Sequence, residues 1–229
     1  MPRRRRFIAA GGCYHVINRG NNRATVFDRP SDYKAFAYLI RDAQERGSLD
    51  LLAACLMPNH FHLVVRPHGR DDIGRWMHWL LTTHSHRYHL ARGTSGRVWQ
   101  GPYKAFPVER DLHLFTVMRY VERNAVRAGL VGRARDWCWS SASWRHGPAW
   151  LAALIVEPPV ARPLNWDGFL DQPQTLEELE SVRTCVNRQC PFGSQAWLKS
   201  AAECQWYEPP VRKRGRPRKK NAPVPPGNR

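Results

Sequence analysis

The chain has 229 residues, of which 42% are apolar, and a formal net charge of +17. This apolar content is enough for a packed core and excludes a wholly disordered chain, while the basic balance favours a polyanionic partner, nucleic acid first and an anionic membrane second. There is no run of 18 apolar residues to cross a bilayer, and the N-terminal arginines do not precede the apolar segment of a secretory signal.

In chain order, the first part of the sequence alternates between strand and helix patterns. The expected strands are 13–18, 49–57, 60–66 and 104–108, with a polar loop at 19–23. The expected helices run from a cap at Ser31 or Asp32 to Gly47, over about 72–90, and from a cap at Asp111 to about 128. The first six elements have the βαββαβ order, which indicates an α+β ferredoxin-like sandwich with helices on one face of an antiparallel sheet. The last helix is an addition to that fold.

The composition of the chain changes after Trp144. Prolines interrupt a stretch rich in Trp and Ala, Thr175 can cap a further helix, and 195–203 is another helical candidate. From Pro209 onward Pro, Gly, Arg and Lys dominate, which favours disorder in the absence of a partner. We therefore expect a main domain at 1–146, a small helical appendage at 147–208 and a basic tail at 209–229.

His60 and His62 lie two residues apart on a predicted strand, so both side chains leave the same face of the sheet. Two neighbouring imidazoles form half of a site for a divalent metal ion. Taken alone, such a pair is more often two half-buried histidines at a sheet surface.

Tyr120 and Asn124 lie one turn apart on the flank of the apolar stripe of the last predicted helix, with Arg127 on the same side. A tyrosine hydroxyl at the edge of the core, beside a carboxamide and a cation, is well placed to meet a metal-bound phosphate. Taken alone, the same residues fit an ordinary boundary tyrosine and an asparagine near a helix end.

Together these segments resemble the single-tyrosine transposases that carry an HUH motif. Met57 to Val65 is similar to the His-hydrophobic-His motif of that family, and Arg119 to Val131 is similar to its catalytic helix. The segments Tyr14 to Arg23 and Arg214 to Lys219 resemble the branch of REP-associated tyrosine transposases. The similarity covers residues 7–146 well and the remainder more loosely.

The resemblance implies a metal-dependent endonuclease and strand transferase that acts on single-stranded DNA. Tyr120 would be the nucleophile and would form a 5′-phosphotyrosine intermediate, releasing a 3′-OH. His60, His62 and Asn124 would hold Mg²⁺ or Mn²⁺, and two imidazoles with an amide suit Mn²⁺ better. The implied substrates are hairpin palindromic repeats, the domain at 1–146 would be catalytic, and a monomer is favoured over the dimer of related insertion-sequence enzymes.

Two positions depart from the pattern of that family. Related insertion-sequence transposases usually carry Gln at the position of Asn124, so the third metal ligand rests here on a shorter side chain. Many relatives have Pro where this chain has Ala125. A proline bends a helix, so we expect the local geometry to differ.

Several residues are candidates for contact with DNA. Arg19, Asn21, Asn22 and Arg23 offer donors for phosphates and base edges, although a solvated turn has the same composition. Arg214-Gly-Arg216-Pro resembles an AT-hook core, which fits the narrow minor groove of A·T-rich DNA, although a solubility tail is the alternative. Aromatic residues at 99, 103 and 106 could stack on bases but are more often core, and four histidines at 78, 84, 86 and 89 are expected on a polar or DNA-facing surface.

Two other functions remain open. A domesticated relative would bind structured DNA repeats without cleaving them, and an RNA-binding ferredoxin-like module would need exposed aromatic residues in place of His60 and His62. The six cysteines are scattered, without a Cys-x-x-Cys pair. This favours reduced thiols and a cytoplasmic, nucleoid-associated protein over disulfides or a zinc site.

Overall fold

The computed structural model describes residues 8–203 of the chain. The predicted basic tail at 209–229, with Arg214 and Arg216 of the AT-hook-like segment, lies outside the described residues. No helix of the described part is both long and apolar enough to span a membrane.

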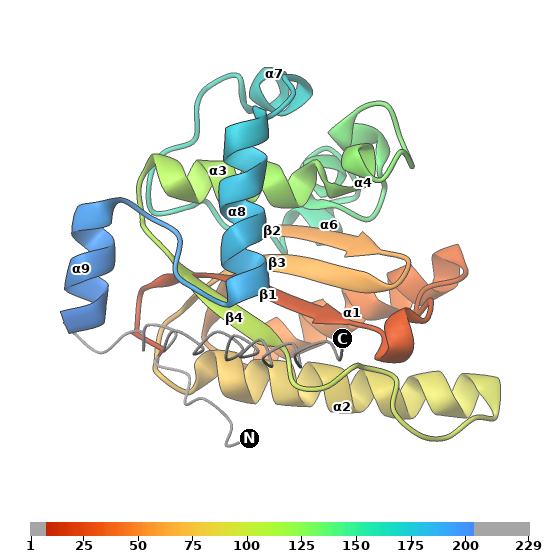
Figure 1. The fold of residues 1–229 in the computed structure, drawn as a ribbon. Coiled ribbons are helices and arrows are strands. Elements are labelled where there is room, and N and C mark those ends of the chain that lie inside the picture. The colour runs from red at the N-terminus through yellow and green to blue at the C-terminus, as the bar shows by residue number, and fades with distance from the viewer. Residues whose placement is uncertain (1–7, 204–229) are drawn as a thin grey trace, which may run out of the picture.

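A four-stranded antiparallel sheet forms the centre of the fold (Figure 1). Its strands are β1 (Cys13–Arg19), β2 (Leu49–Met57), β3 (His60–Pro67) and β4 (Lys104–Val108). They lie in the order β2-β3-β1-β4, so β4 is an edge strand, as predicted. With α1 (Pro30–Arg46) and α2 (Asp72–Arg92) the strands complete the βαββαβ order, and the predicted ferredoxin-like sandwich is confirmed.

The alternation of side chains along each strand gives the sheet two differently covered faces. On one face Phe61 of β3 packs with Phe36 of α1 and with the apolar stripe of α2. On the other face Val64, three residues after Phe61 on β3, packs with Leu114 of α3 (Leu112–Glu122). Figure 1 shows the sheet between α2 and α3. The even-numbered positions of β3, which include His60 and His62, therefore face α3.

The helix that carries Tyr120 is interrupted, and here the prediction of one continuous helix to about residue 128 was wrong. The helix α3 ends at Glu122, Arg123 leaves the helical region at φ −85° and ψ 7°, and α4 (Asn124–Arg127) follows. The Ala125 amide donates to the Cys55 sulfur of β2. A side chain inserted into the helical ladder is a known cause of a kink, so this chain bends beside Asn124 without the proline of its relatives.

The chain after α4 first passes along the edge strand β2, where Trp144 and Leu151 pack into the α1 side of the core, and then covers the α3 side of the sheet. Its short elements are η2 (Ala134–Asp136), α5 (Ser141–Trp144), α6 (Ala149–Ala152) and α7 (Trp166–Asp171), and its longer helices are α8 (Leu176–Arg188) and α9 (Gln195–Glu203). Thr175 caps α8 in a capping box with Glu178, as predicted. In Figure 1, α8 crosses in front of α3, and Val182 of α8 belongs to the same apolar cluster as Tyr120.

Three local expectations are corrected or resolved. The helix α1 starts at Pro30, whose fixed φ suits a first helical position, so Asp32 accepts the amides of Asp28 and Arg29 from the third position and is not the N-cap. His84 is 6% exposed and lies one turn beyond Leu80 on the buried stripe of α2, not on a polar surface. Trp99, Tyr103 and Phe106 are buried, so they belong to the core and do not form a stacking surface. The cysteines of the described part are free thiols.

Candidate active site

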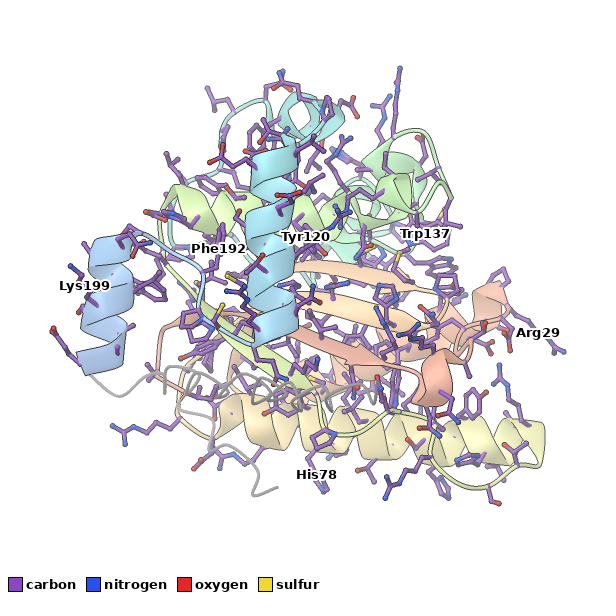
Figure 2. The ribbon with its side chains drawn as sticks, viewed as in Figure 1. Arg29, His78, Tyr120, Trp137, Phe192 and Lys199 are labelled. Atoms are coloured by element: carbon purple, nitrogen blue, oxygen red, sulfur yellow. The ribbon has the colours of Figure 1, made fainter. Side chains whose placement is uncertain are left out.

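The predicted histidines and the predicted tyrosine meet between the sheet and α3. The rings of His60 and His62 have centroids 5.0 Å apart on β3. The Tyr120 ring of α3 stands edge-on to His62, with the two ring centroids 5.9 Å apart. Tyr120 is 8% exposed and His62 4% exposed, and Figure 2 shows Tyr120 beside α8. Two separate segments of the sequence are thus joined in one buried polar site.

His15 of β1 is a further member of the site, although no sequence motif assigned it a role. Its Nε2 atom lies 2.9 Å from Nδ1 of His62, and the two rings are stacked with centroids 5.1 Å apart. Its ring is also 6.0 Å from that of Tyr120. His15 alternates along β1 with core residues of the other face, so its side of the sheet was predictable. Its position beside His62 could be known only from the register of β1 against β3, which places His15 opposite Val64.

Arg127 of α4 lies against Tyr120, although the helix that was expected to connect them is interrupted at Arg123. Its guanidinium carbon is 3.9 Å from the centroid of the Tyr120 ring. A long contact of 3.5 Å joins Nη1 to the Gln174 side chain. The Nη2 atom is buried and has no partner among residues 8–203. A buried cationic nitrogen without an acceptor is suited to an anionic oxygen supplied by a ligand.

Asn124 is placed near the site but is not engaged with it. It is the first residue of α4 and is 9% exposed. Within the described part of the chain, its carboxamide forms no hydrogen bond with either histidine. The kink at Arg123 also removes the uninterrupted i, i+4 relation with Tyr120 on which its predicted position rested.

Burial keeps the imidazoles of the site neutral. Desolvation lowers the pKa of His15 to about 3 and that of His60 to about 4, and the pKa of His62 lies well below its ordinary value for the same reason. The positive charge of Arg127 lowers all three further. A metal ion binds the neutral form of imidazole, so these rings are in the form that a ligand requires.

The predicted DNA-contacting loop lies next to the histidine pair. Arg19 is paired with His60 across β1 and β3, and the following turn, η1 (Asn21–Arg23), is exposed at Asn22 and Arg23. The Gly20 amide donates to the Asn59 carbonyl oxygen at 2.8 Å. A Cβ atom on Gly20 would collide with the Ala24 backbone, so the loop can fold this tightly only with glycine there.

A second group of potential metal ligands lies at the other end of α3. Single ligand atoms of Glu109, Asp111 and His113 are within 4.8 Å of one another, so the three side chains can hold a metal ion. The same groups already have partners, because Glu109 accepts the Ser194 amide at 2.6 Å and Asp111 accepts the His113 amide at 2.8 Å. His113 precedes Tyr120 by seven residues of helix, which is about 10 Å. The triad is therefore separate from the histidine pair.

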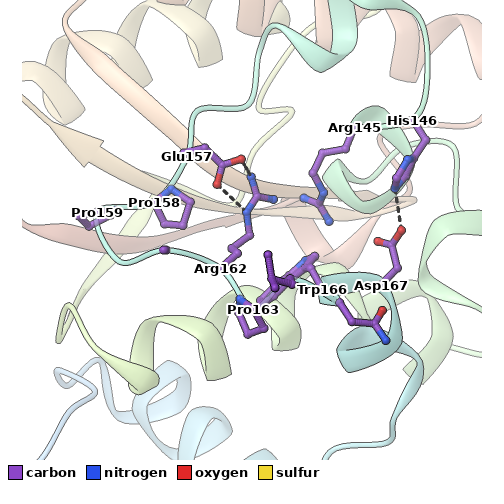
Figure 3. A pocket seen from close by; sticks show the side chains of 12 residues that line it. Arg145, His146, Glu157, Pro158, Pro159, Arg162, Pro163, Trp166 and Asp167 are labelled. Atoms are coloured by element: carbon purple, nitrogen blue, oxygen red, sulfur yellow. Dashed lines mark hydrogen bonds and ion pairs between the residues drawn. The ribbon is translucent and has the colours of Figure 1, made fainter.

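The cationic side chains that line the groove in Figure 3 are paired with carboxylates. It has a volume of about 700 Å³ and is lined by the 157–167 segment together with Arg145 and His146. Arg162 is paired with Glu157, and His146 Nε2 is 2.8 Å from the Asp167 carboxylate. Arg145 is bound by Glu122. Its cations are therefore already compensated, unlike Arg127.

Comparison with known proteins identifies the family. Residues 10–124 match the family model described as transposase, IS200-like, and this segment is half of the chain. The chain therefore belongs to the IS200-like transposases, and the resemblance inferred from its motifs is confirmed. The matched segment contains His60, His62 and Tyr120 and ends at Asn124.

Two solved structures are similar to this chain. A REP-associated tyrosine transposase bound to a REP hairpin is 20% identical, with a TM-score of 0.52 over 62% of this chain and 82% of that one. A putative transposase from Deinococcus radiodurans is also 20% identical, with a TM-score of 0.38 over 54% of this chain and 97% of that one. The first comparison supports the fold, and no curated protein matches the chain.

Proposed function

We propose that this transposase is a metal-dependent endonuclease and strand transferase for single-stranded DNA, with Tyr120 as its nucleophile. The arrangement of Tyr120 carries the proposal. Its ring lies between the buried His62 of the histidine pair and Arg127, whose Nη2 atom lacks an acceptor. A phosphodiester placed there would have a nucleophile, a cation and two potential metal ligands within one site.

The proposed reaction exchanges one ester for another. The Tyr120 oxygen attacks the phosphorus, the bond from phosphorus to the 3′ oxygen breaks, and that oxygen leaves as a 3′-OH after taking up a proton. The phenolic proton passes to solvent. The resulting 5′-phosphotyrosine conserves the energy of the broken ester, so the strand can be rejoined by the reverse attack without ATP. Arg127 would balance the charge on the phosphate during both steps.

The donor set fits a divalent metal ion. The Nε2 atoms of His60 and His62 have no hydrogen-bond partner within residues 8–203, because the bonds of both rings are made at Nδ1. His60, His62 and, with its shorter side chain, Asn124 would hold Mg²⁺ or Mn²⁺, with Mn²⁺ better suited to imidazole ligands. The ion would polarise the scissile phosphate and orient it for attack.

The proposed substrate is a palindromic repeat folded as a hairpin. One structure of similar fold is described as bound to a REP hairpin, and the loop of Arg19, Asn21, Asn22 and Arg23 lies beside His60 in this chain. This loop would contact the single strand next to the cleavage site. The outlying Arg214 and Arg216 would bind flanking A·T-rich duplex. We propose a monomer that acts in the cytoplasm, on the nucleoid.

A cleavage assay tests the proposal. A labelled hairpin repeat from the flanks of the gene is incubated with Mn²⁺ or Mg²⁺ and the wild type, Tyr120→Phe or His62→Ala. The expected result is a metal-dependent nick by the wild type and none by either variant, with hairpin binding retained by all three. Tight binding without a nick by the wild type would favour the alternative, a domesticated protein that binds structured repeats and does not cleave them.

A further inference from the structure

We infer that His15 and Asn59 are positioning residues that fix the proton of each metal histidine on Nδ1 and leave both Nε2 atoms open to the ion. This inference rests on the proposed function of His60 and His62 as metal ligands. It assigns each of the two histidines its own hydrogen-bond acceptor, one from the turn between β2 and β3 and one from β1.

The Asn59 contact determines the tautomer of His60. Nδ1 of His60 lies 2.6 Å from Oδ1 of Asn59. The orientation of that amide is fixed independently, because its Nδ2 atom donates to the Arg23 carbonyl oxygen at 3.2 Å. An amide oxygen only accepts hydrogen bonds, so the His60 proton must be on Nδ1. The lone pair of His60 is then on Nε2.

The His15 contact works in the same way for His62, with one additional step. Nε2 of His15 and Nδ1 of His62 are 2.9 Å apart, and two neutral rings share one proton at such a contact. If His15 donated, the His62 proton would be on Nε2 and would block metal binding there. If His62 donates, its Nε2 lone pair is free. Only the second arrangement is compatible with a ligand role for His62 at Nε2.

Packing holds His15 in the place that this role requires. The His15 ring is stacked on His62 at an interplanar angle of 25°, and the edge of Phe106 meets its ring with centroids 6.1 Å apart. His15 is 2% exposed, so water does not compete readily for the shared proton. Hydrogen-bonded partners of metal ligands orient the ring and raise its basicity, and their loss typically weakens metal binding by about 10–100-fold.

The first test measures Mn²⁺ binding to the full-length protein by the electron paramagnetic resonance signal of the free ion. The variants are His15→Leu, which removes the acceptor, and His15→Gln, whose side-chain oxygen can accept near the position of Nε2. We expect His15→Leu to raise the Kd for Mn²⁺ by about 10–100-fold and His15→Gln to restore a value close to that of the wild type. Asn59→Leu is expected to weaken binding in the same direction.

The second test does not require a variant to fold or a metal to bind. Two-bond nitrogen–proton spectra of the metal-free wild type with ¹⁵N-labelled histidine report which nitrogen carries the proton. We expect Nδ1–H for both His60 and His62. An Nε2–H tautomer of either ring, or unchanged Mn²⁺ affinity in His15→Leu, would overturn the inference. The proposed function would still stand in that case if Mn²⁺ binding depended on His62. Unchanged Mn²⁺ binding in His62→Ala would instead remove the metal site itself, and the inference with it.

Discussion

The Arg127 guanidinium is the cation most directly placed for the proposed reaction, because it contacts the Tyr120 ring and has a buried Nη2 atom without an acceptor. Replacing Arg127 with Gln should therefore slow cleavage of a hairpin substrate by about 100-fold in single-turnover assays, the size of effect seen when one transition-state donor is removed. Affinity for Mn²⁺ should not fall, since the guanidinium is not a ligand and its positive charge opposes a second cation at the histidine pair.

The matched control for Arg127→Gln is Arg41→Gln. Arg41 is exposed on α1, across the sheet from α3, and its replacement makes the same change in net charge. It is expected to cleave at nearly the wild-type rate. Equal losses in the two variants would show that the effect comes from overall charge and would contradict a local role for Arg127.

The buried side chain of His84 should make the free energy of unfolding depend on pH. Burial lowers its pKa to about 4, and its Nδ1 atom has no partner among the described residues. Arg92 lowers this pKa further, and Asp32 opposes the shift. Above about pH 6.5 the ring is neutral in both folded and unfolded chains. As the pH falls from about 6.5 to about 4, the unfolded chain binds a proton that the folded one does not, so the free energy of unfolding should decrease by about 3 kcal/mol in total.

Urea unfolding of the wild type and His84→Leu between pH 7.5 and pH 4 would measure this term. The variant should lose less stability than the wild type over that range, because its side chain does not titrate. His78→Leu is the control, since His78 is exposed on the same helix (Figure 2). A His84→Leu curve parallel to the wild-type curve would contradict the prediction.

The kink between α3 and α4 depends on the neighbouring strand and not on proline. The Ala125 amide bonds to the Cys55 sulfur, so a proline at 125 would break no bond of the helical ladder. We expect Ala125→Pro to lower the free energy of unfolding by the loss of this one bond to a sulfur acceptor, which is weaker than a bond to a carbonyl oxygen. Thr116→Pro, in the uninterrupted part of α3, should cost about 3 kcal/mol or more. A loss of comparable size in both variants, measured by urea unfolding, would show that position 125 is part of a regular helix.

A buried ion pair attaches the later short helices to the end of α3. Glu122 is fully buried and accepts Arg145 Nη1 at 2.6 Å, Arg145 Nη2 at 2.9 Å and Trp166 Nε1 at 2.8 Å, together with a short bond from Ser141. Arg145→Met would leave a buried carboxylate without its counter-charge, so we expect the free energy of unfolding to fall by about 3–5 kcal/mol.

Adding Glu122→Gln to Arg145→Met should recover part of that loss, because the double variant no longer buries an uncompensated charge. The opposite result would be a loss of stability, on adding Glu122→Gln to Arg145→Met, equal to the loss caused by Glu122→Gln alone. That result would indicate that Glu122 acts independently of Arg145. Chemical denaturation of Arg145→Met, Glu122→Gln, the double variant and the wild type provides the comparison.

The sequence patterns were sufficient to predict the helices and strands of the main domain and part of the candidate active site. Strand alternation placed His60 and His62 on one surface, and the helical stripe placed Tyr120 at the edge of the core. The kink at Arg123 and the role of His15 were not predictable, because both depend on contacts between segments distant in sequence: Ala125 with Cys55, and β1 with β3. His84 was misplaced although its spacing from Leu80 on the stripe of α2 carried the signal for burial.

The folded molecule brings together what the sequence distributes over more than a hundred residues. The sheet fixes His15 and the histidine pair, α3 places Tyr120 over them, and α4 adds Arg127. Charge alone predicted a polyanionic partner but not where it binds, because net charge carries no information on position. Arg127 combines a buried nitrogen without an acceptor with a location beside the tyrosine, and this combination links the basic composition to a reaction.

The most direct test of the central claim is mass spectrometry of the covalent protein–DNA adduct. The wild type is incubated with a hairpin repeat and Mn²⁺, denatured, and digested with protease and nuclease. We predict a nucleotide attached through a 5′-phosphate to the peptide that contains Tyr120, and a free 3′-OH on the released strand. An adduct on another residue, or a cleaved strand without any adduct, would contradict Tyr120 as the nucleophile.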